Sequence, residues 1–201
     1  RSYSVTGVQT CALPISVAAQ GQGARAARTA PDQMFDQYFV EYTFPDGAKL
    51  YAEGRHTSNC WDIFSDFAHG SRGSALIMEN LAAANPRIYG GQVQSREHET
   101  WRYRSEPRDP YQLEQDLFFK AIRDDQPYNE TERSARACMV SILGRMAADS
   151  GRWITYDEAF ASDLELAPRL DSLRSLDDPA PVMPDAEGRY PVPVPGQTRV
   201  L

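Results

Sequence analysis

The sequence predicts an α+β fold: a mostly antiparallel open sheet with helices packed on one face, followed by a proline-rich tail. Three observations predict it. Short alternating strand patterns joined by tight turns come first, helical patterns follow, and prolines crowd the C-terminal end. Strands linked by short turns pair antiparallel, and helices that come after them cover one face of the sheet. We expect one domain over residues 17–170 and an extended tail over residues 171–201.

The strand patterns occupy the first half of the chain. A first strand is expected to carry Arg25 and Arg28, which in a regular strand face opposite sides. In Phe35–Phe44, alternate apolar residues make one face, and the turn Pro45-Asp46-Gly47 leads into a partner strand at Lys49–Arg55. Further strands are predicted at Ile63–His69, Ser74–Met78 and about His98–Arg104.

Three helices are predicted after the strands. Asp109-Pro110 is typical of a helix start, and Leu113, Leu117 and Ala121 share one stripe behind it. A second helix is expected from about Glu132 to Asp149, with Gly151 as its stop. Its predicted buried stripe consists of Ala135, Cys138, Met139, Ile142 and Met146. Thr155 and Glu158 predict a capping box ahead of a short third helix.

The two ends of the chain differ from its middle in composition. Residues 5–15 read VTGVQTCALPI, which is what a common short-read sequencing adapter encodes in one frame. We therefore treat residues 1–16 as an artefact and expect genuine sequence from Val17. A rival interpretation, a secretory signal ending at VAA, is disfavoured because Thr6, Gln9 and Thr10 interrupt its apolar stretch. The tail, which ends in PVPVPG, is expected to be wrapped over a surface or loose.

Charge and cysteine content exclude several classes of protein. Without residues 1–16 the chain holds 20 basic and 28 acidic side chains, a net charge of −8 that repels phosphate backbones, so we expect no nucleic-acid partner. No apolar run approaches the roughly 18 residues of a membrane helix, so we expect no membrane partner. Cys60 and Cys138 have no metal-site spacing and are interpreted as buried small apolar residues.

Few residues stand out for chemistry. Gly21-Gln22-Gly23 lacks the third glycine of a dinucleotide loop. Arg55-His56 closes a predicted strand, where the pair either binds an oxygen-rich substrate or is simply exposed at a loop mouth. His69 is interpreted as a hydrogen-bonding turn residue and His98 as a solvated strand residue. The residues by themselves indicate an α+β domain without a demonstrable active site.

Several segments in order resemble the C-terminal domain of the Gfo/Idh/MocA oxidoreductases, in a subgroup frequent in Planctomycetes and Bacteroidetes. The resemblance spans Val17 to the C-terminus. The segments that carry it are QGQGARAAR (20–28), FDQYFVEYTFPDGAKLY (35–51), RHTSNCWD (55–62), HGSRGSA (69–75), WRYR (101–104), PYQLEQDLFFKAIRDDQPYNE (110–130) and ILGRMAADSGRWITYDEA (142–159).

The resemblance implies a parent enzyme that transfers hydride between NAD or NADP and a sugar or polyol. The family's cofactor domain and catalytic residues would lie upstream of Val17, so we expect no catalytic, cofactor-binding or metal-binding residue in this chain. Substrate contacts are expected from Arg25, Arg28, Arg55 and His56. The chain departs from the subgroup at Gln115, where a histidine is usual.

The resemblance leaves an alternative to an enzyme fragment. Without a cofactor domain, the chain is expected to be inactive alone and to act as an oligomerisation or carbohydrate-binding module. The family implies a homo-oligomer formed through the open face of the sheet. Cellular location stays open between cytoplasmic and exported, because any export signal would lie upstream.

Overall fold

The computed structural model describes residues 17–79, 86–104 and 109–201, and it confirms the predicted α+β class. The described strands form two four-stranded sheets in which all paired neighbours are antiparallel. By internal contacts the chain divides into two compact units, one holding residues up to Ser58 with Thr131–Leu201 and the other holding Asn59–Glu130. The predicted domain over residues 17–170 stays a prediction. The adapter interpretation concerns residues 1–16, which lie outside the described residues.

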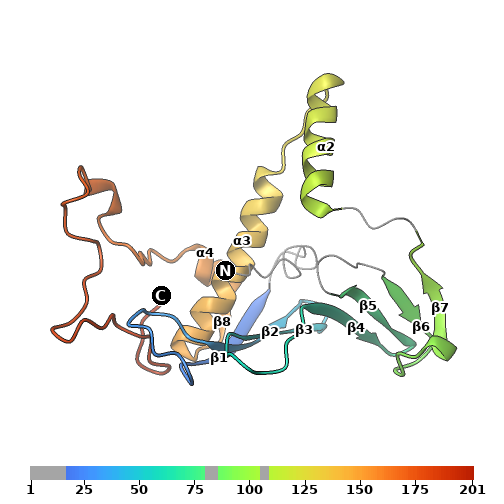
Figure 1. Ribbon diagram of the computed structural model, residues 1–201, viewed down its shortest axis with the longest axis horizontal. Helices are drawn as coiled ribbons and strands as arrows, with labels where there is room; N and C mark the ends of the chain where they lie inside the picture. The colour runs from blue at the N-terminus through green and yellow to red at the C-terminus, as the bar shows by residue number, and fades with distance from the viewer. Residues whose placement is uncertain (1–16, 80–85, 105–108) are drawn as a thin grey trace. The chain divides into compact units, whose positions relative to one another are not determined.

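The first unit is built on the sheet β3-β2-β1-β8 (Figure 1). Its strands are β1 (Ala18–Ala24), β2 (Gln37–Thr43), β3 (Lys49–Arg55) and β8 (Ile154–Thr155). The predicted hairpin is confirmed, because β2 and β3 pair along their whole length. Gly47, at a φ of 85°, lets the turn close, and its N–H donates to the Phe44 carbonyl at 2.9 Å.

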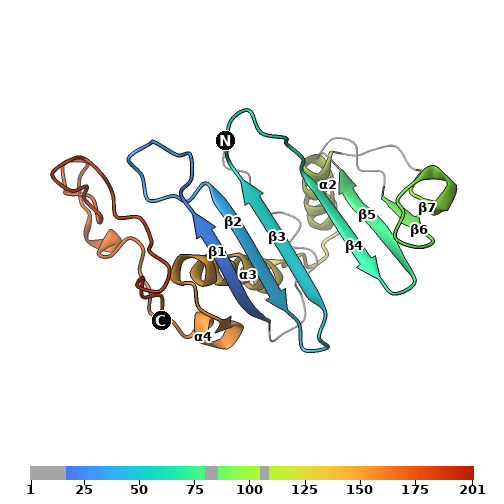
Figure 2. The same ribbon diagram turned by 90° about the horizontal axis from the view of Figure 1, so that it is seen from below.

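Helix α3 (Thr131–Ser150) covers one face of this sheet, packing on β1 and β2 (Figure 2). Alternation in the strands sends Ala19, Val40 and Tyr42 toward the helix, where they are buried with Leu143 and Ala147. Removing these apolar side chains from water stabilises the unit. The opposite face of the sheet carries Gln20, Gln22, Phe39, Glu41 and Tyr51, and no helix within the described residues of the first unit packs on it.

The predicted buried stripe of this helix was largely wrong. Ala135 and Cys138 are exposed and Ile142 is 49% exposed. Met146 is buried as predicted, and Met139 is half-buried against the core. The residues that face the sheet are instead small or medium-sized and follow a neighbouring stripe: Ala137, Val140, Leu143, Gly144, Ala147 and Ala148. The helix lies so close to β1 that a Cβ on Gly21 would stand 3.1 Å from the Ala148 nitrogen, so only small residues fit between them.

The second unit contains the sheet β4-β5-β6-β7 and helix α2. Its elements are β4 (Ser65–Gly70), β5 (Gly73–Glu79), β6 (Arg87–Tyr89), β7 (Glu99–Arg102) and α2 (Pro110–Arg123). The predicted hairpin around residues 70–73 is confirmed, while β6 was not predicted. The start of α2 is confirmed, since the Asp109 side chain accepts from the backbone nitrogens of Tyr111 and Gln112. Its predicted apolar stripe is only partly covered: Leu113 and Ala121 are half-buried, and Leu117 is 47% exposed.

The C-terminal part of the chain returns to the first unit. The predicted capping box is present at the start of α4 (Tyr156–Phe160), between Thr155 and Glu158. From there the chain is irregular, yet its end is anchored: Val200 is buried in the core, and the Gly196 nitrogen donates to the Ser150 carbonyl at 2.7 Å. No helix within the described ranges is long and apolar enough to span a membrane.

Candidate functional site

The loop of residues 25–36, between β1 and β2, is organised around the carboxylate of Asp36. This side chain is 2% exposed and accepts hydrogen bonds from the backbone nitrogens of Ala26, Ala27 and Arg28, each at 2.7 Å. These bonds, beginning with that from Ala26, lower the pKa of Asp36 from its usual range. A buried carboxylate that receives three backbone donors is a structural anchor, so Asp36 holds the loop in one conformation.

Arg25 and Arg28 both lie beyond the end of β1, which corrects the prediction that they occupy opposite sides of a strand. They converge on Asp32 instead: Arg28 Nε lies 2.7 and 2.8 Å from its carboxyl oxygens, and an Arg25 guanidinium nitrogen lies 3.2 Å from one of them. The bond from Arg28 is the main reason why the pKa of Asp32 is lowered. Arg25 also donates to the carbonyls of Arg28, Ala30 and Met34. The two arginines therefore brace the loop.

Arg55 and His56 lie at the same end of the sheet as this loop. The register aligns Ala24 with Gln37 and Gln37 with Arg55, so the ends of β1 and β3 flank the start of β2. The backbone nitrogen of His56 donates to the Asp36 carbonyl at 2.8 Å. All four predicted substrate residues thus lie around one end of the first sheet, which we call the loop end. Whether they contact substrate stays a prediction.

Of the other described histidines and cysteines, His69, His98 and Cys60 belong to the second unit and Cys138 lies on α3. His69 is exposed at the end of β4 and bonds the Gln92 side chain at 2.7 Å, in keeping with a hydrogen-bonding turn residue. His98 lies in a 3₁₀ turn rather than in the predicted strand and contacts Ser95. Cys60 and Cys138 are both exposed, which corrects their interpretation as buried residues. Cys138 is exposed because it lies outside the stripe of α3 that faces the sheet.

Gly21 and Gly23 have a structural explanation that excludes a phosphate cradle. Both lie inside β1, an antiparallel strand, rather than in a turn that leads into a helix. A Cβ on Gly23 would come within 2.2 Å of the Phe35 ring, so glycine is required there by packing. The described residues at this motif therefore do not fit a nicotinamide dinucleotide.

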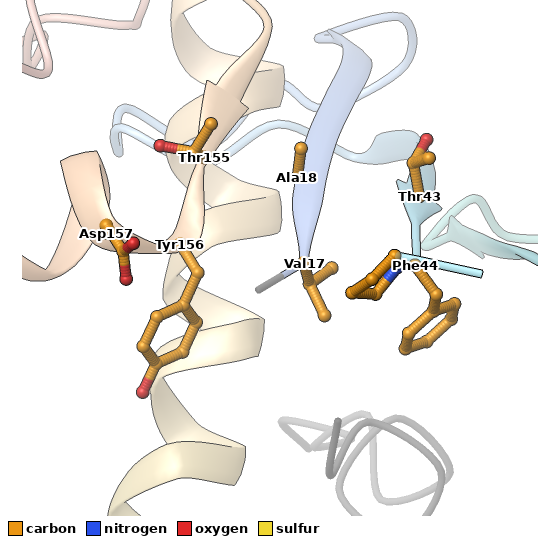
Figure 3. Close-up of a pocket in the computed structure, with 8 residues that line it drawn as sticks. Val17, Ala18, Thr43, Phe44, Thr155, Tyr156 and Asp157 are labelled. Atoms are coloured by element: carbon orange, nitrogen blue, oxygen red, sulfur yellow. The ribbon is translucent and has the colours of Figure 1, made fainter. Parts of the chain in front are cut away.

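A small pocket lies at the other end of the first sheet (Figure 3). Its volume is about 360 Å³, and it is lined by Val17, Ala18, Thr43, Phe44, Pro45, Thr155, Tyr156 and Asp157. The Tyr156 nitrogen donates to the Val17 carbonyl at 2.7 Å, which ties α4 to the start of β1. The lining is mainly apolar but includes Tyr156 and Asp157, whose hydroxyl and carboxyl groups can donate or accept protons.

A polar network crosses the open face of the first sheet. Lys49 Nζ donates to Glu41 Oε1 at 2.7 Å and to Thr43 Oγ1 at 2.7 Å, and Gln20 lies 3.4 Å from the same Glu41 oxygen. The bond from Lys49 is the main cause of the lowered pKa of Glu41. Next to this network, a groove of about 470 Å³ runs between β1 and the segment at Trp153.

Sequence reasoning missed the residues that organise both regions. Asp32 and Asp36 hold the loop of residues 25–36 in place. The sequence feature that could have indicated them is the presence of two carboxylates in a short segment that also contains Arg25 and Arg28. Gln20, Gln22 and Trp153 line the groove. Alternation along the strands could have indicated them, because neighbouring residues of a strand face opposite sides of the sheet. Polar residues 20 and 22 alternate with small residues 19, 21 and 23, and Trp153 precedes the buried Ile154.

Comparisons with known proteins show similarity at the level of the fold. No family model and no curated protein matches the chain. Among solved structures, the chain is similar to aldose-aldose oxidoreductase from Caulobacter crescentus complexed with glycerol, with a TM-score of 0.50 and 16% identity over 70% of this chain and 41% of that chain. This similarity shows a fold that is found in part of an oxidoreductase, in agreement with the predicted fold class.

Two further structures are similar at slightly lower TM-scores. GenD2 from gentamicin A biosynthesis, in complex with NAD, has a TM-score of 0.48 and 16% identity over 71% of this chain and 42% of that chain. A Thermotoga maritima structure has a TM-score of 0.49 and 12% identity over 70% of this chain and 40% of that chain. The chain thus spans about two fifths of the length of the solved structures that it matches.

Proposed function

We propose that this chain is the substrate-side part of a nicotinamide-dependent oxidoreductase of the Gfo/Idh/MocA type that acts on a sugar or polyol. The observation that carries the proposal is the similarity of the fold to part of a known oxidoreductase, which agrees with the resemblance of the sequence. The ordered sequence segments resemble the C-terminal domain of this family, and the fold is similar to part of an aldose-aldose oxidoreductase. The subgroup and the nature of the substrate belong to the proposal.

In the proposed enzyme, NAD or NADP is bound by a Rossmann domain outside this chain and supplies or accepts the hydride. The residues of β1 do not fit the dinucleotide, so no step is assigned to them. The 201-residue chain alone should show no saturable binding of NADH or NADPH in a fluorescence titration. Measurable affinity would contradict the proposal that the nicotinamide is bound by a domain outside this chain. Genomic sequence upstream of the Val17 codon should encode a glycine-rich strand–turn–helix and a Glu-Lys-Pro segment.

We assign the substrate side of the proposed enzyme to the loop end of the first sheet. Arg55, His56, Arg25 and Arg28 gather there, and guanidinium and imidazole groups donate hydrogen bonds to hydroxyl oxygens. Arg55→Ala and His56→Ala in the full-length enzyme should raise KM. Arg25→Ala should lower the unfolding midpoint, because it removes the bonds that brace the loop. Unchanged KM in the first two variants would remove the loop end from the proposal.

The alternative is a non-catalytic oligomerisation or carbohydrate-binding module. The observation that favours it is the aromatic pair Phe39 and Tyr51, stacked at 5.9 Å on the open face, with Tyr51 57% exposed. We propose a homo-oligomer with its contact centred on β3 and Tyr51. Sedimentation analysis should show an oligomer that Tyr51→Lys dissociates. A monomeric chain at all concentrations would refute the oligomer while leaving the oxidoreductase proposal untouched.

A further inference from the structure

The groove on the open face of the first sheet has fixed walls. It is lined by Trp153, by Pro195 of the tail, by Phe39 of β2 and by the polar side chains Gln20, Gln22 and Glu41. The tail is held in place because the Gly196 nitrogen donates to the Ser150 carbonyl at 2.7 Å, next to Gly151 in a left-handed turn. The groove is therefore preformed, a property shared by most small-molecule sites of this size.

The groove presents two aromatic surfaces to solvent. Trp153 is 51% exposed and Phe39 is 38% exposed, and the ring of Phe39 is supported from behind by the stacked ring of Tyr51. Trp153 is held over the sheet, with Lys49 Nζ 5.9 Å from its ring centroid. Large aromatic faces that stay half exposed are suited to stack on the apolar face of a flat ligand.

The polar groups between these rings are neutral amides and one neutralised carboxylate. Gln20 and Gln22 are exposed, and each amide offers both donors and an acceptor. The negative charge of Glu41 is compensated by Lys49 at 2.7 Å. Uncharged donors and acceptors favour a neutral ligand rich in hydroxyl groups, whereas a phosphorylated or carboxylated ligand would find no uncompensated positive charge among the described groove residues.

We propose that this groove is a saccharide-binding site, in which a pyranose ring stacks on Trp153 and its hydroxyl groups bond Gln20 and Gln22. A sugar ring has an apolar CH face, which can stack on the ring of Trp153, and polar hydroxyl groups at its edge, which can bond the amides of Gln20 and Gln22. The site goes beyond the proposed oxidoreductase function because it needs neither a cofactor nor the loop end. It also names the residues that would bind the ligand if the chain is a carbohydrate-binding module.

The test uses the 201-residue chain and three probes: maltopentaose, cellopentaose and myo-inositol. Binding is followed by tryptophan fluorescence and by calorimetry. We expect saturable binding of at least one oligosaccharide, weakened about tenfold by Trp153→Ala, the scale of one lost aromatic contact. Gln22→Leu, an exposed change that leaves the core intact, should weaken binding about threefold or more. The matched controls Trp61→Ala and Gln115→Leu, exposed residues of the other unit, should bind like the unmodified chain.

Three outcomes would overturn the proposal: no saturable binding of any probe, binding that is insensitive to both Trp153→Ala and Gln22→Leu, or equal losses in the control variants. An oligomer that Trp153→Ala dissociates, without any saccharide binding, would identify the groove as part of an interface between copies. Because no nicotinamide is present in these assays, failure here is distinguishable from failure of the oxidoreductase proposal.

Discussion

At Gly144, α3 lies directly against Tyr42 of β2, and Gly144→Ala tests whether that close approach requires glycine. A Cβ at this position would stand 2.0 Å from Tyr42 Oη and 2.9 Å from Tyr42 Cζ. The tyrosine has little room to move, since it is 3% exposed and its hydroxyl donates to the Val140 carbonyl at 3.2 Å. Burial raises the pKa of Tyr42 to about 12, so its hydroxyl stays protonated as a donor.

The expected cost of Gly144→Ala follows from opposing effects. In an exposed helix the change would stabilise by about 1 kcal/mol. Here overpacking costs roughly 1–3 kcal/mol, and the displaced hydroxyl loses a hydrogen bond that contributes about 1 kcal/mol. The steric cost wins, and we expect a net destabilisation of about 2 kcal/mol, or a fall in Tm of about 4–8 °C for a chain of this size.

Urea unfolding followed by circular dichroism measures this cost, and a double-mutant cycle with Tyr42→Phe assigns it. Removing the hydroxyl takes away the nearest atom, so Gly144→Ala should cost less than about 1 kcal/mol in the Tyr42→Phe background. Gly54→Ala is the control, because no heavy atom lies within 4 Å of a Cβ there. The reasoning is refuted by a Gly144→Ala variant as stable as the unmodified chain, or by an equal cost in both backgrounds.

Three further predictions concern polar groups of the first unit. Asp36→Asn turns an amide nitrogen toward a backbone N–H and should lower the free energy of unfolding by about 2 kcal/mol in urea at pH 7. The pKa of Asp36 is lowered in the folded state, so its carboxylate stabilises the fold above about pH 4 and this contribution is lost as pH falls. The difference in stability between the variant and the unmodified chain should therefore shrink in acid. Asp149 has its Oδ1 buried without a partner among the described residues, and burial raises its pKa. Ionisation of Asp149 therefore costs stability as pH rises from its unfolded pKa, about 4, to its raised folded pKa, so Asp149→Asn should gain stability relative to the unmodified chain over that rise. Urea unfolding that shows the same difference below and above this range would contradict the reasoning. Thr155→Ala should cost about 1 kcal/mol by loss of the capping box, whereas Thr155→Ser should cost less, as thermal melts of both variants will show.

Local signals predicted the elements well because their causes are local. The turn at Gly47, the Asp109 cap of α2, the capping box at Thr155 and the stop at Gly151 each depend on a few neighbouring residues, and all are present. The alternation in β2 also predicted its buried face, since Val40 and Tyr42 point to the core. The stripe of α3 was misassigned because its apolar residues are spread around the helix, and the partner surface decides which of them are covered.

The candidate sites were predicted only in part. Arg55 and His56 were selected as a strand end, and the register shows that they share this end with Arg25 and Arg28. The role of Asp32 and Asp36 was not visible, because it depends on how a loop of twelve residues folds back on itself. The groove was not visible either, since it joins residues 20–23, 39, 41, 151, 153 and 195, which are far apart along the chain.

The sequence by itself determined the α+β class, the hairpins and caps, the acidic surface and the resemblance to a family of oxidoreductases. It did so because turn chemistry, periodicity and charge are properties of short segments. Only the tertiary structure decided which glycines are needed, which arginines brace a loop, and which polar residues meet on the open face of the sheet. Those outcomes depend on contacts between segments that are far apart in the sequence, and only the packing of the folded chain brings such segments together.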